Sequence, residues 1–196
     1  MIKKPLPKTS RAMRALKTKN KLLKSAVKLI DKYGYEEVTI EDISKQAGVS
    51  IGAFYHYYKS KTDILVELFK QIDQYFKQNE PNILSHKNAG ESLTKFFQYY
   101  ADFHASRGLD HTRSILRVQS PFFNDRSRYM FTLLTKIVID AQETGIFTRT
   151  YTTEKIVDYF LLIIRGLLFD WVVESGRYDF LERVVTDIEI AKRIFV

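Results

Sequence analysis

The distribution of proline is the feature that most limits what this chain can fold into. Its four prolines stand at positions 5, 7, 81 and 121, so the long intervals between them contain no residue that breaks a helix. Apolar residues in these intervals recur three, four and seven positions apart, which is the spacing of one helix face. This pattern predicts an all-α fold of about nine helices, with only segment 184–190 ambiguous. The longest helices are expected over about residues 10–33, 153–175 and 179–194. Two further long helices are expected, one ending before Pro81 and one ending at Gly145.

Positive charge is concentrated at the N-terminal end of the chain. The 196 residues carry a net charge of +8, yet residues 1–61 hold 14 Lys and Arg against 5 Asp and Glu, and the remainder holds 17 against 18. The first 30 residues contain no acidic side chain. A basic excess confined to one end predicts an anionic partner, which is most often nucleic acid or an anionic membrane surface.

Several classes of protein are disfavoured by composition. The chain has no cysteine, which excludes a disulfide framework and a thiolate metal site and is typical of a reducing cytoplasm. No apolar signal sequence opens the chain. The most apolar run, residues 156–173, contains Asp158, Arg165 and Asp170, which a bilayer-spanning helix would have to bury in lipid. We therefore expect a cytoplasmic protein that is not inserted in a membrane.

Catalytic patterns are missing as well. The sequence contains no phosphate-binding glycine loop and no HExxH pattern. Its four histidines lack the spacing of metal ligands. The sequence therefore predicts no enzyme activity, no cofactor and no metal site.

The most informative segment is residues 39–61, TIEDISKQAGVSIGAFYHYYKSK. Thr39 and Asp42 have the spacing of a capping box that opens a helix. Gly48 can adopt the left-handed backbone of a sharp turn, and Ser50 can cap a second helix in which Phe54 is the main buried residue. Two short helices joined in this way form a helix-turn-helix, whose second helix fits the major groove of DNA. A glycine-linked hairpin with no DNA-binding role is the alternative.

Around this segment the sequence resembles the tetracycline-repressor (TetR) family of bacterial transcription regulators. The resemblance covers about residues 22–65, from LLKSAVKLIDKYGYEEVTIEDISKQAGVS to IGAFYHYYKSKTDIL. It implies an all-α homodimer with an N-terminal DNA-binding domain and a larger C-terminal domain that senses a ligand and dimerises. The corresponding division is a basic arm over residues 1–17, a helix-turn-helix domain over 18–62 and a ligand-binding and dimerisation domain over 63–196.

The resemblance also implies which residues contact DNA. In this sequence the recognition helix has no Arg, Lys, Asn or Gln to read bases, so His56 is its evident polar base reader. Lys61 is expected to act as a phosphate clamp. Operator choice must then depend on apolar contacts, DNA shape or the arm. The implied contact residues are Thr39, Ser50, Ile51, Gly52, Ala53, Tyr55, His56, Tyr57, Lys59 and Lys61, together with Lys8, Arg11 and Arg14 of the arm. The alternative for the arm is a solvated basic tail.

The C-terminal domain offers less specific signals. Its many aromatic residues between 75 and 131 suit either a plain core or a ligand cavity. An inward Arg113 or Arg117 would favour an acidic or phenolic effector. The candidate ligand-binding residues are Phe96, Tyr100, Phe103, His104, Arg117, Phe122 and Tyr129. The candidate dimer-interface residues are Leu161, Ile164, Leu168, Trp171, Val185 and Ile188, the alternative being an ordinary core helix of a monomer.

The sequence thus predicts a homodimeric transcriptional repressor that a small molecule releases from a palindromic operator. One alternative is a ligand-independent DNA-binding or nucleoid-associated protein with the same fold, which an empty or filled-in cavity would favour. The other is a helical protein whose basic arm binds an anionic membrane surface or a protein partner.

Overall fold

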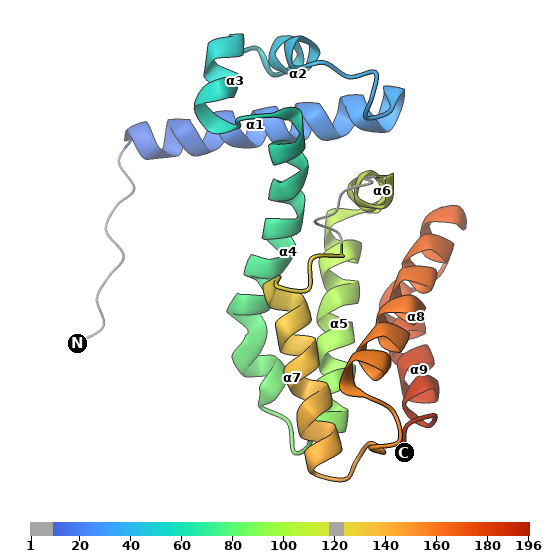
Figure 1. Cartoon of the computed structure of the whole chain (residues 1–196). Helices are drawn as coiled ribbons and strands as arrows, with labels where there is room; N and C mark the ends of the chain where they lie inside the picture. Colours follow the sequence, from blue (N-terminus) through green and yellow to red (C-terminus); the bar gives the residue numbers. More distant parts are fainter. Residues whose placement is uncertain (1–9, 118–123) are drawn as a thin grey trace, which may run out of the picture. The chain divides into compact units, whose positions relative to one another are not determined.

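The computed structural model describes residues 10–117 and 124–196 (Figure 1), and within these ranges the chain has nine helices and no strand. This confirms the all-α prediction. The chain divides at Glu67–Leu68, inside α4, into an N-terminal and a C-terminal compact unit, whereas the sequence pattern places the division at 62–63. The helices are α1 (Ser10–Tyr33), α2 (Ile40–Ala47), α3 (Ile51–Tyr57), α4 (Lys61–Leu84), α5 (Ala89–Arg107), α6 (Leu109–Arg117), α7 (Tyr129–Glu143), α8 (Thr153–Val173) and α9 (Phe180–Lys192).

In the N-terminal unit, α2 and α3 pack on the apolar face of α1. Leu22, Ala26 and Ile30 of α1 are buried, as are Ile43 of α2 and Phe54 of α3. These residues recur at helical spacing in α1, so one side of that long helix supplies most of the small core. The unit is therefore held together by the apolar pattern that the sequence displays.

The length of α4 corrects one expectation. The helix was expected to end before Pro81, but it continues through Pro81 to Leu84. Pro81 lies in the last turn, where the missing N–H removes only the bond to the carbonyl of Lys77. The same turn buries Ile83 fully and packs Leu84 against the core. Apolar burial at the end of the helix therefore outweighs the lost hydrogen bond.

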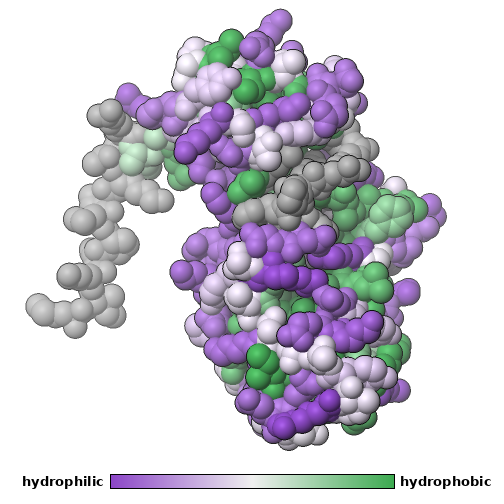
Figure 2. Space-filling model, in the orientation of Figure 1, coloured by the Kyte–Doolittle hydropathy of each residue, from purple (hydrophilic) through white to green (hydrophobic). Residues whose placement is uncertain are grey.

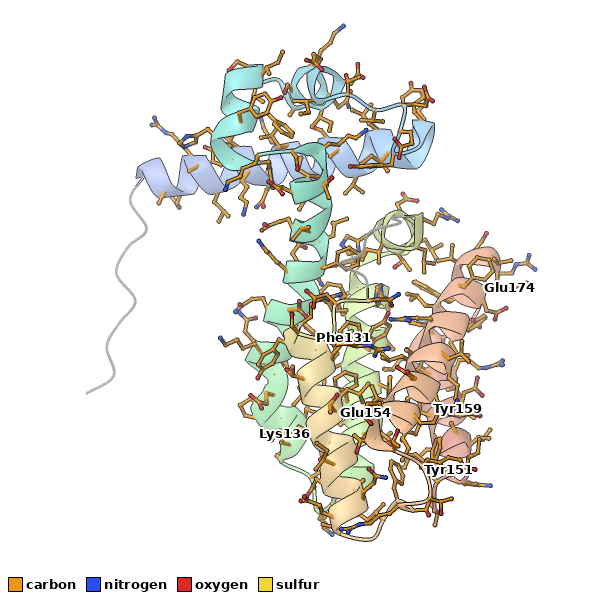
Figure 3. The ribbon with its side chains drawn as sticks, in the orientation of Figure 1. Phe131, Lys136, Tyr151, Glu154, Tyr159 and Glu174 are labelled. Carbon is orange, nitrogen blue, oxygen red and sulfur yellow. The ribbon has the colours of Figure 1, made fainter. Side chains whose placement is uncertain are left out.

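The C-terminal unit is built around α5, which packs against α6, α7 and α9. Its core is rich in aromatic rings: Phe76 and Phe96 lie 4.5 Å apart between centroids. The ring of Phe195 contacts the rings of Tyr151 and Tyr159, with centroid distances of 5.8 and 5.3 Å. Figure 3 labels these two tyrosines. The ambiguous segment 184–190 is helical and belongs to α9, which Asp179 caps. Among the described residues, no helix is both long and apolar enough to cross a membrane.

Candidate nucleic-acid interface and effector cavity

The turn between α2 and α3 has the geometry that its sequence predicts. The Thr39 hydroxyl accepts the backbone N–H of Asp42, and the Asp42 carboxylate accepts that of Thr39, both at 3.1 Å. Gly48 has a φ of +66°, in the left-handed region. The Ser50 hydroxyl accepts the N–H of Ala53 at 3.1 Å and begins α3. The helix-turn-helix is therefore fixed by local hydrogen bonds within residues 39–53.

The capping box has a consequence for the expected phosphate contact of Thr39. Asp42 also accepts the Thr39 hydroxyl at 2.6 Å, and these hydrogen bonds lower the pKa of Asp42. A carboxylate thus already lies at the positive end of α2. A DNA phosphate would have to share Thr39 with that carboxylate.

The outer face of α3 consists of the residues expected to touch DNA. Ile51, Gly52, Tyr55 and His56 are exposed, as is Ser50 at the helix start. Ala53 and Tyr57 are half-buried, while Phe54 and Tyr58 face the core as expected. A Cβ added at Gly52 would meet no atom nearer than Ser50 Oγ at 3.9 Å, so the fold itself does not require glycine there. A glycine at position 52 is instead explained if a surface outside the chain, such as DNA, packs closely against α3.

Lys61 is not placed as the expected phosphate clamp. Its ammonium donates to the carbonyls of Tyr35, Val38 and Glu36 at 2.5, 2.9 and 3.4 Å. It also lies 4.1 Å from the centre of the Tyr35 ring. Since an ammonium has three donors, these carbonyls take up its whole capacity. These partners lie about 25 residues away in sequence, where no local pattern reveals them. The phosphate contact of Lys61 therefore stays a prediction that this geometry does not favour. Lys59, in contrast, is exposed.

The basic arm is only partly described. Lys8 lies outside the described residues, and the side chain of Arg11 is not described. Arg14 is exposed on the first turns of α1. Lys19 pairs with Glu67 at 2.9 Å and lies over the ring of Tyr58, which joins this part of α1 to α3 and α4. Residues 10–17 of the predicted arm are thus helical and continue α1.

The C-terminal unit contains a small cavity that is partly open to solvent. Its volume is about 20 Å³, room for about one water molecule. The walls combine apolar side chains with four polar ones, and the lining residues are Phe69, Ile72, Tyr100, His104, Ile115, Arg128, Met130, Phe131, Leu161, Ile164 and Arg165. Phe131, labelled in Figure 3, lies in the first turn of α7. The cavity is therefore nearly filled by the chain's own side chains.

Arg128 is the most buried charged side chain at this cavity. It is 4% exposed, and its Nε and Nη2 donate to the two oxygens of Asp73 at 2.9 and 3.3 Å. Nη2 also donates to the carbonyl of Phe69 at 3.3 Å. Arg165, the second arginine, donates to Oδ1 of Asn124 at 3.0 Å, and burial lowers its pKa. Because arginine side chains carry a positive charge in proteins, the cavity wall contains two cations.

His104 contributes a hydrogen-bond acceptor. Its ring is fully buried, and Nδ1 lies 3.3 Å from the Thr112 hydroxyl, which itself donates to the carbonyl of Gly108. Nδ1 must therefore carry the hydrogen, and Nε2 is left as an acceptor with no partner among the described residues. Burial, with the nearby His111 and Arg107, lowers the pKa of His104 to about 3. The imidazole is thus neutral at physiological pH.

The predicted ligand-binding residues divide into four groups. Tyr100 and His104 line the cavity, whereas Phe96 and Phe103 belong to the surrounding core and are not among its lining residues. Tyr129 turns away and donates to Glu80. The side chain of Arg117 and all of Phe122 lie outside the described part. Arg113 forms an ion pair with Asp110 at 3.1 Å. The arginines that do line the cavity, Arg128 and Arg165, were missed, although an arginine inside the most apolar run of the sequence was an available signal.

The predicted dimer-interface residues face the chain's own core. Five of the six are buried, and Val185 is half-buried; the buried ones are Leu161, Ile164, Leu168, Trp171 and Ile188. The predicted interface is therefore corrected, because these side chains pack inside one chain. The exposed apolar side chains of α8 are Leu162, Phe169 and Val173, at 68, 61 and 58%. With Gly166 they form a stripe at helical spacing, here called the α8 stripe. Figure 2 shows hydrophobic residues gathered along the edge of the C-terminal unit where Figure 1 places α8. Because α8 is apolar nearly all round, periodicity cannot tell these faces apart.

Comparison with known proteins places the N-terminal unit in a family. The model described as "Bacterial regulatory proteins, tetR family" matches residues 22–68. The fatty acid metabolism regulator protein of Bacillus subtilis is 45% identical over 49 residues, which are 25% of this chain and 25% of that protein. The HTH-type transcriptional regulator YerO of B. subtilis is 38% identical over 48 residues, 24% of this chain and 17% of YerO. The chain thus spans a quarter or less of the curated relatives it matches.

Solved structures extend the likeness to the whole fold. The transcriptional regulator FadR from B. subtilis, in complex with stearoyl-CoA, has a TM-score of 0.77 at 20% identity, covering 88% of this chain and 96% of FadR. FadR from Bacillus halodurans has a TM-score of 0.78 at 18% identity, and the match covers 88% of this chain and 97% of that FadR. PfmR from Thermus thermophilus has a TM-score of 0.69 at 22% identity, and the match covers 88% of this chain and 97% of PfmR. At these identities the likeness concerns the fold alone. Residues 22–68 of the chain match the family of bacterial regulatory proteins described as tetR.

Proposed function

We propose that this chain is a DNA-binding transcriptional regulator that represses from a palindromic operator in the cytoplasm and is released by a small-molecule effector. The observation that carries the proposal is the outer face of α3, where Ile51, Gly52, Tyr55 and His56 are exposed beside the basic α1. A helix of this kind enters the major groove, while lysines along α1 contact phosphates. The family match over residues 22–68 supports the same role.

A palindromic operator requires a two-fold symmetric protein, and the α8 stripe supports a homodimer. Leu162, Phe169 and Val173 would be covered by the same residues of a second copy, as a two-fold interface demands. At Gly166 an added Cβ would meet no atom within 4 Å, so nothing inside the chain explains a glycine in mid-helix. Close packing of a partner helix at this point does explain it.

For the effector we propose a compound with a long acyl chain. Support comes from the fold shared with FadR, which was solved with stearoyl-CoA, and from the apolar walls of the cavity. The cavity of about 20 Å³ is too small for such a chain, so the conformation described is the closed one. An effector that binds only an opened conformation shifts the population away from the closed, operator-binding form.

The nearly filled cavity also supports a second candidate, a ligand-independent DNA-binding protein of the same fold. One experiment separates the two. Purified protein is used to select genomic DNA fragments, the protected sites are mapped, and stearoyl-CoA is then titrated. Discrete palindromic sites released by stearoyl-CoA support the repressor. Sites that persist at every concentration support the ligand-independent protein, and absence of palindromic sites contradicts both.

A further inference from the structure

A buried ion pair joins α4 to the start of α7. Arg128, the residue before α7, makes two hydrogen bonds to the carboxylate of Asp73 on α4. The same carboxylate accepts the backbone N–H of Met130 at 3.2 Å. Asp73 therefore both neutralises Arg128 and caps the first turn of α7. Glu80 forms a second link between these helices farther along α4. Its carboxylate accepts a hydrogen bond from the Tyr129 hydroxyl and forms an ion pair with Lys136 at 3.5 Å.

The same arginine is also part of the cavity wall. Arg128 lines the cavity together with Arg165, whereas no carboxylate is among its described lining residues. Asp73 balances Arg128 from outside this wall. The guanidinium lies over the rings of Phe69 and Phe131, at 4.9 and 5.4 Å, which keeps it in place. The cavity thus presents two cations to whatever enters it, in surroundings where water screens charge poorly.

The remaining walls define the rest of the ligand. Most are aliphatic or aromatic, and the polar exceptions, Tyr100 and His104, are uncharged, because burial raises the pKa of Tyr100 to about 12 and lowers that of His104 to about 3. The unpartnered Nε2 of His104 accepts a hydrogen bond. These surroundings fit an apolar tail that ends in an anionic head group.

We propose that the anionic head group of the effector binds Arg128 in exchange for Asp73, and that this exchange releases α4 from α7. The inference rests on the proposed effector function and adds the charge class of the ligand and the contact it breaks. A carboxylate or phosphate can accept the two parallel N–H bonds that Asp73 now accepts. Fatty-acid carboxylate and acyl-CoA phosphate share this chemistry.

The exchange has a mechanical consequence because Asp73 is largely buried. Its side chain is 16% exposed, and among the described residues its charge would keep only the N–H of Met130 as a partner without Arg128. An uncompensated buried charge is strongly unfavourable, so the turn of α4 that carries Asp73 must move toward solvent. The same movement enlarges a cavity that Phe69 and Ile72 of α4 help to close. Since α4 begins only a few residues after α3, its displacement reaches the recognition helix through continuous chain.

The test measures ligand binding directly, without DNA, for five proteins. These are the wild type, Asp73→Asn, Arg128→Gln, Arg128→Lys and the control Asp187→Asn, which removes a comparable charge from the surface pair with Arg183 at 2.6 Å. The probes are stearate, stearoyl-CoA and the neutral stearyl alcohol, all below the concentration of self-association. The two anionic probes distinguish a carboxylate from a CoA phosphate as the group that Arg128 binds. Thermal unfolding monitors the folding of each variant.

Asp73→Asn removes the competing charge, so we expect it to bind the anionic probe about tenfold more tightly than the wild type while its affinity for stearyl alcohol is unchanged. Arg128→Gln should lose the preference for the anion, and Asp187→Asn should match the wild type. Arg128→Lys, which keeps the charge without the paired geometry, should fall between. A merely structural pair would weaken binding of all probes in Asp73→Asn.

Equal affinities of wild type and Asp73→Asn for both anions would overturn the exchange and leave the proposed function standing. If no probe binds any folded variant, the acyl effector itself is wrong and the exchange fails with it. Operator binding is measured separately on the wild type. Failure to bind an operator would therefore contradict the regulator and not the ligand chemistry.

Discussion

The ammonium of Lys61 lies 2.5 Å from the carbonyl oxygen of Tyr35 and 4.1 Å from the centre of the same residue's ring. One lysine at the start of α4 thus closes the loop that leads from α1 into α2. Its charge stabilises the backbone that presents the helix-turn-helix. This relationship separates the internally bonded Lys61 from the exposed Lys59, two positions away, which we propose contacts DNA.

We predict that Lys61→Met lowers the free energy of unfolding by about 1–3 kcal/mol, because the partly buried carbonyls of Tyr35 and Val38 lose a charged donor. Its effect on the salt dependence of operator binding should be small. Lys59→Met is the matched control: its exposed side chain should leave stability unchanged and reduce the salt slope by about 0.9 if it contacts one phosphate. Urea denaturation and binding at several salt concentrations decide the matter. If instead Lys61→Met reduced the salt slope and Lys59→Met did not, Lys61 would be the phosphate clamp.

Gly52→Ala should separate folding from DNA binding. The added Cβ meets open space, and alanine favours a helix over glycine by about 1 kcal/mol, so stability should be kept or increased. If DNA approaches α3 closely, operator affinity should nevertheless fall at least about tenfold. Gly48→Ala provides the contrast, since a φ of +66° should make that variant less stable by about 1 kcal/mol. Unchanged operator affinity in Gly52→Ala would place the DNA elsewhere.

Neighbouring residues of α8 should respond in opposite ways to substitution. Phe169→Asp, on the α8 stripe, should weaken dimerisation at least about tenfold with little loss of monomer stability. Leu168→Ala, one position earlier but 1% exposed, should cost about 2–5 kcal/mol of stability. Sedimentation equilibrium measures the first effect and chemical denaturation the second. A dimer that survives Phe169→Asp unchanged would rule out this face.

Two buried histidines should make the C-terminal unit less stable in acid. Burial lowers the pKa of His104 to about 3 and that of His111 to about 4, against 6.5 for an unperturbed histidine. Below pH 6.5 the unfolded chain binds protons that the folded chain does not, so stability is full above 6.5 and falls as the pH drops toward 4. The slope approaches about 1.4 kcal/mol per pH unit for each histidine.

His104→Gln should flatten this pH dependence by the share of one histidine, as measured by the free energy of unfolding between pH 7 and 4. The exposed His86 offers a control, and His86→Gln should leave the profile unchanged. A profile that is the same in all three proteins would mean that His104 is accessible to protons in the folded state.

The accuracy of the sequence-based predictions follows the distance over which each interaction acts. The Thr39 capping box, the left-handed Gly48 and the Ser50 cap depend on residues three or four positions apart, and each was predicted correctly. The ion pair between Asp73 and Arg128 spans 55 positions and left no pattern to read. Such contacts depend on how helices pack, which periodicity does not specify.

The error at Pro81 has a different origin, because a local rule was applied correctly and outweighed by burial of Ile83. The face of α8 shows a third limit. Leu161 and Leu162 are chemically the same residue, yet one is 2% and the other 68% exposed. In a helix that is apolar nearly all round, only the surrounding structure decides which side lies inside.

Gly166 gives the α8 stripe a notch between Leu162 and Phe169. If the stripe pairs with itself as proposed, each copy must offer a notch to the other, and a related chain with a larger side chain there would clash. The glycine then acts as a filter on partner choice. It would keep subunits of this regulator from mixing with others of the same fold in one cell, and so keep two regulatory circuits apart.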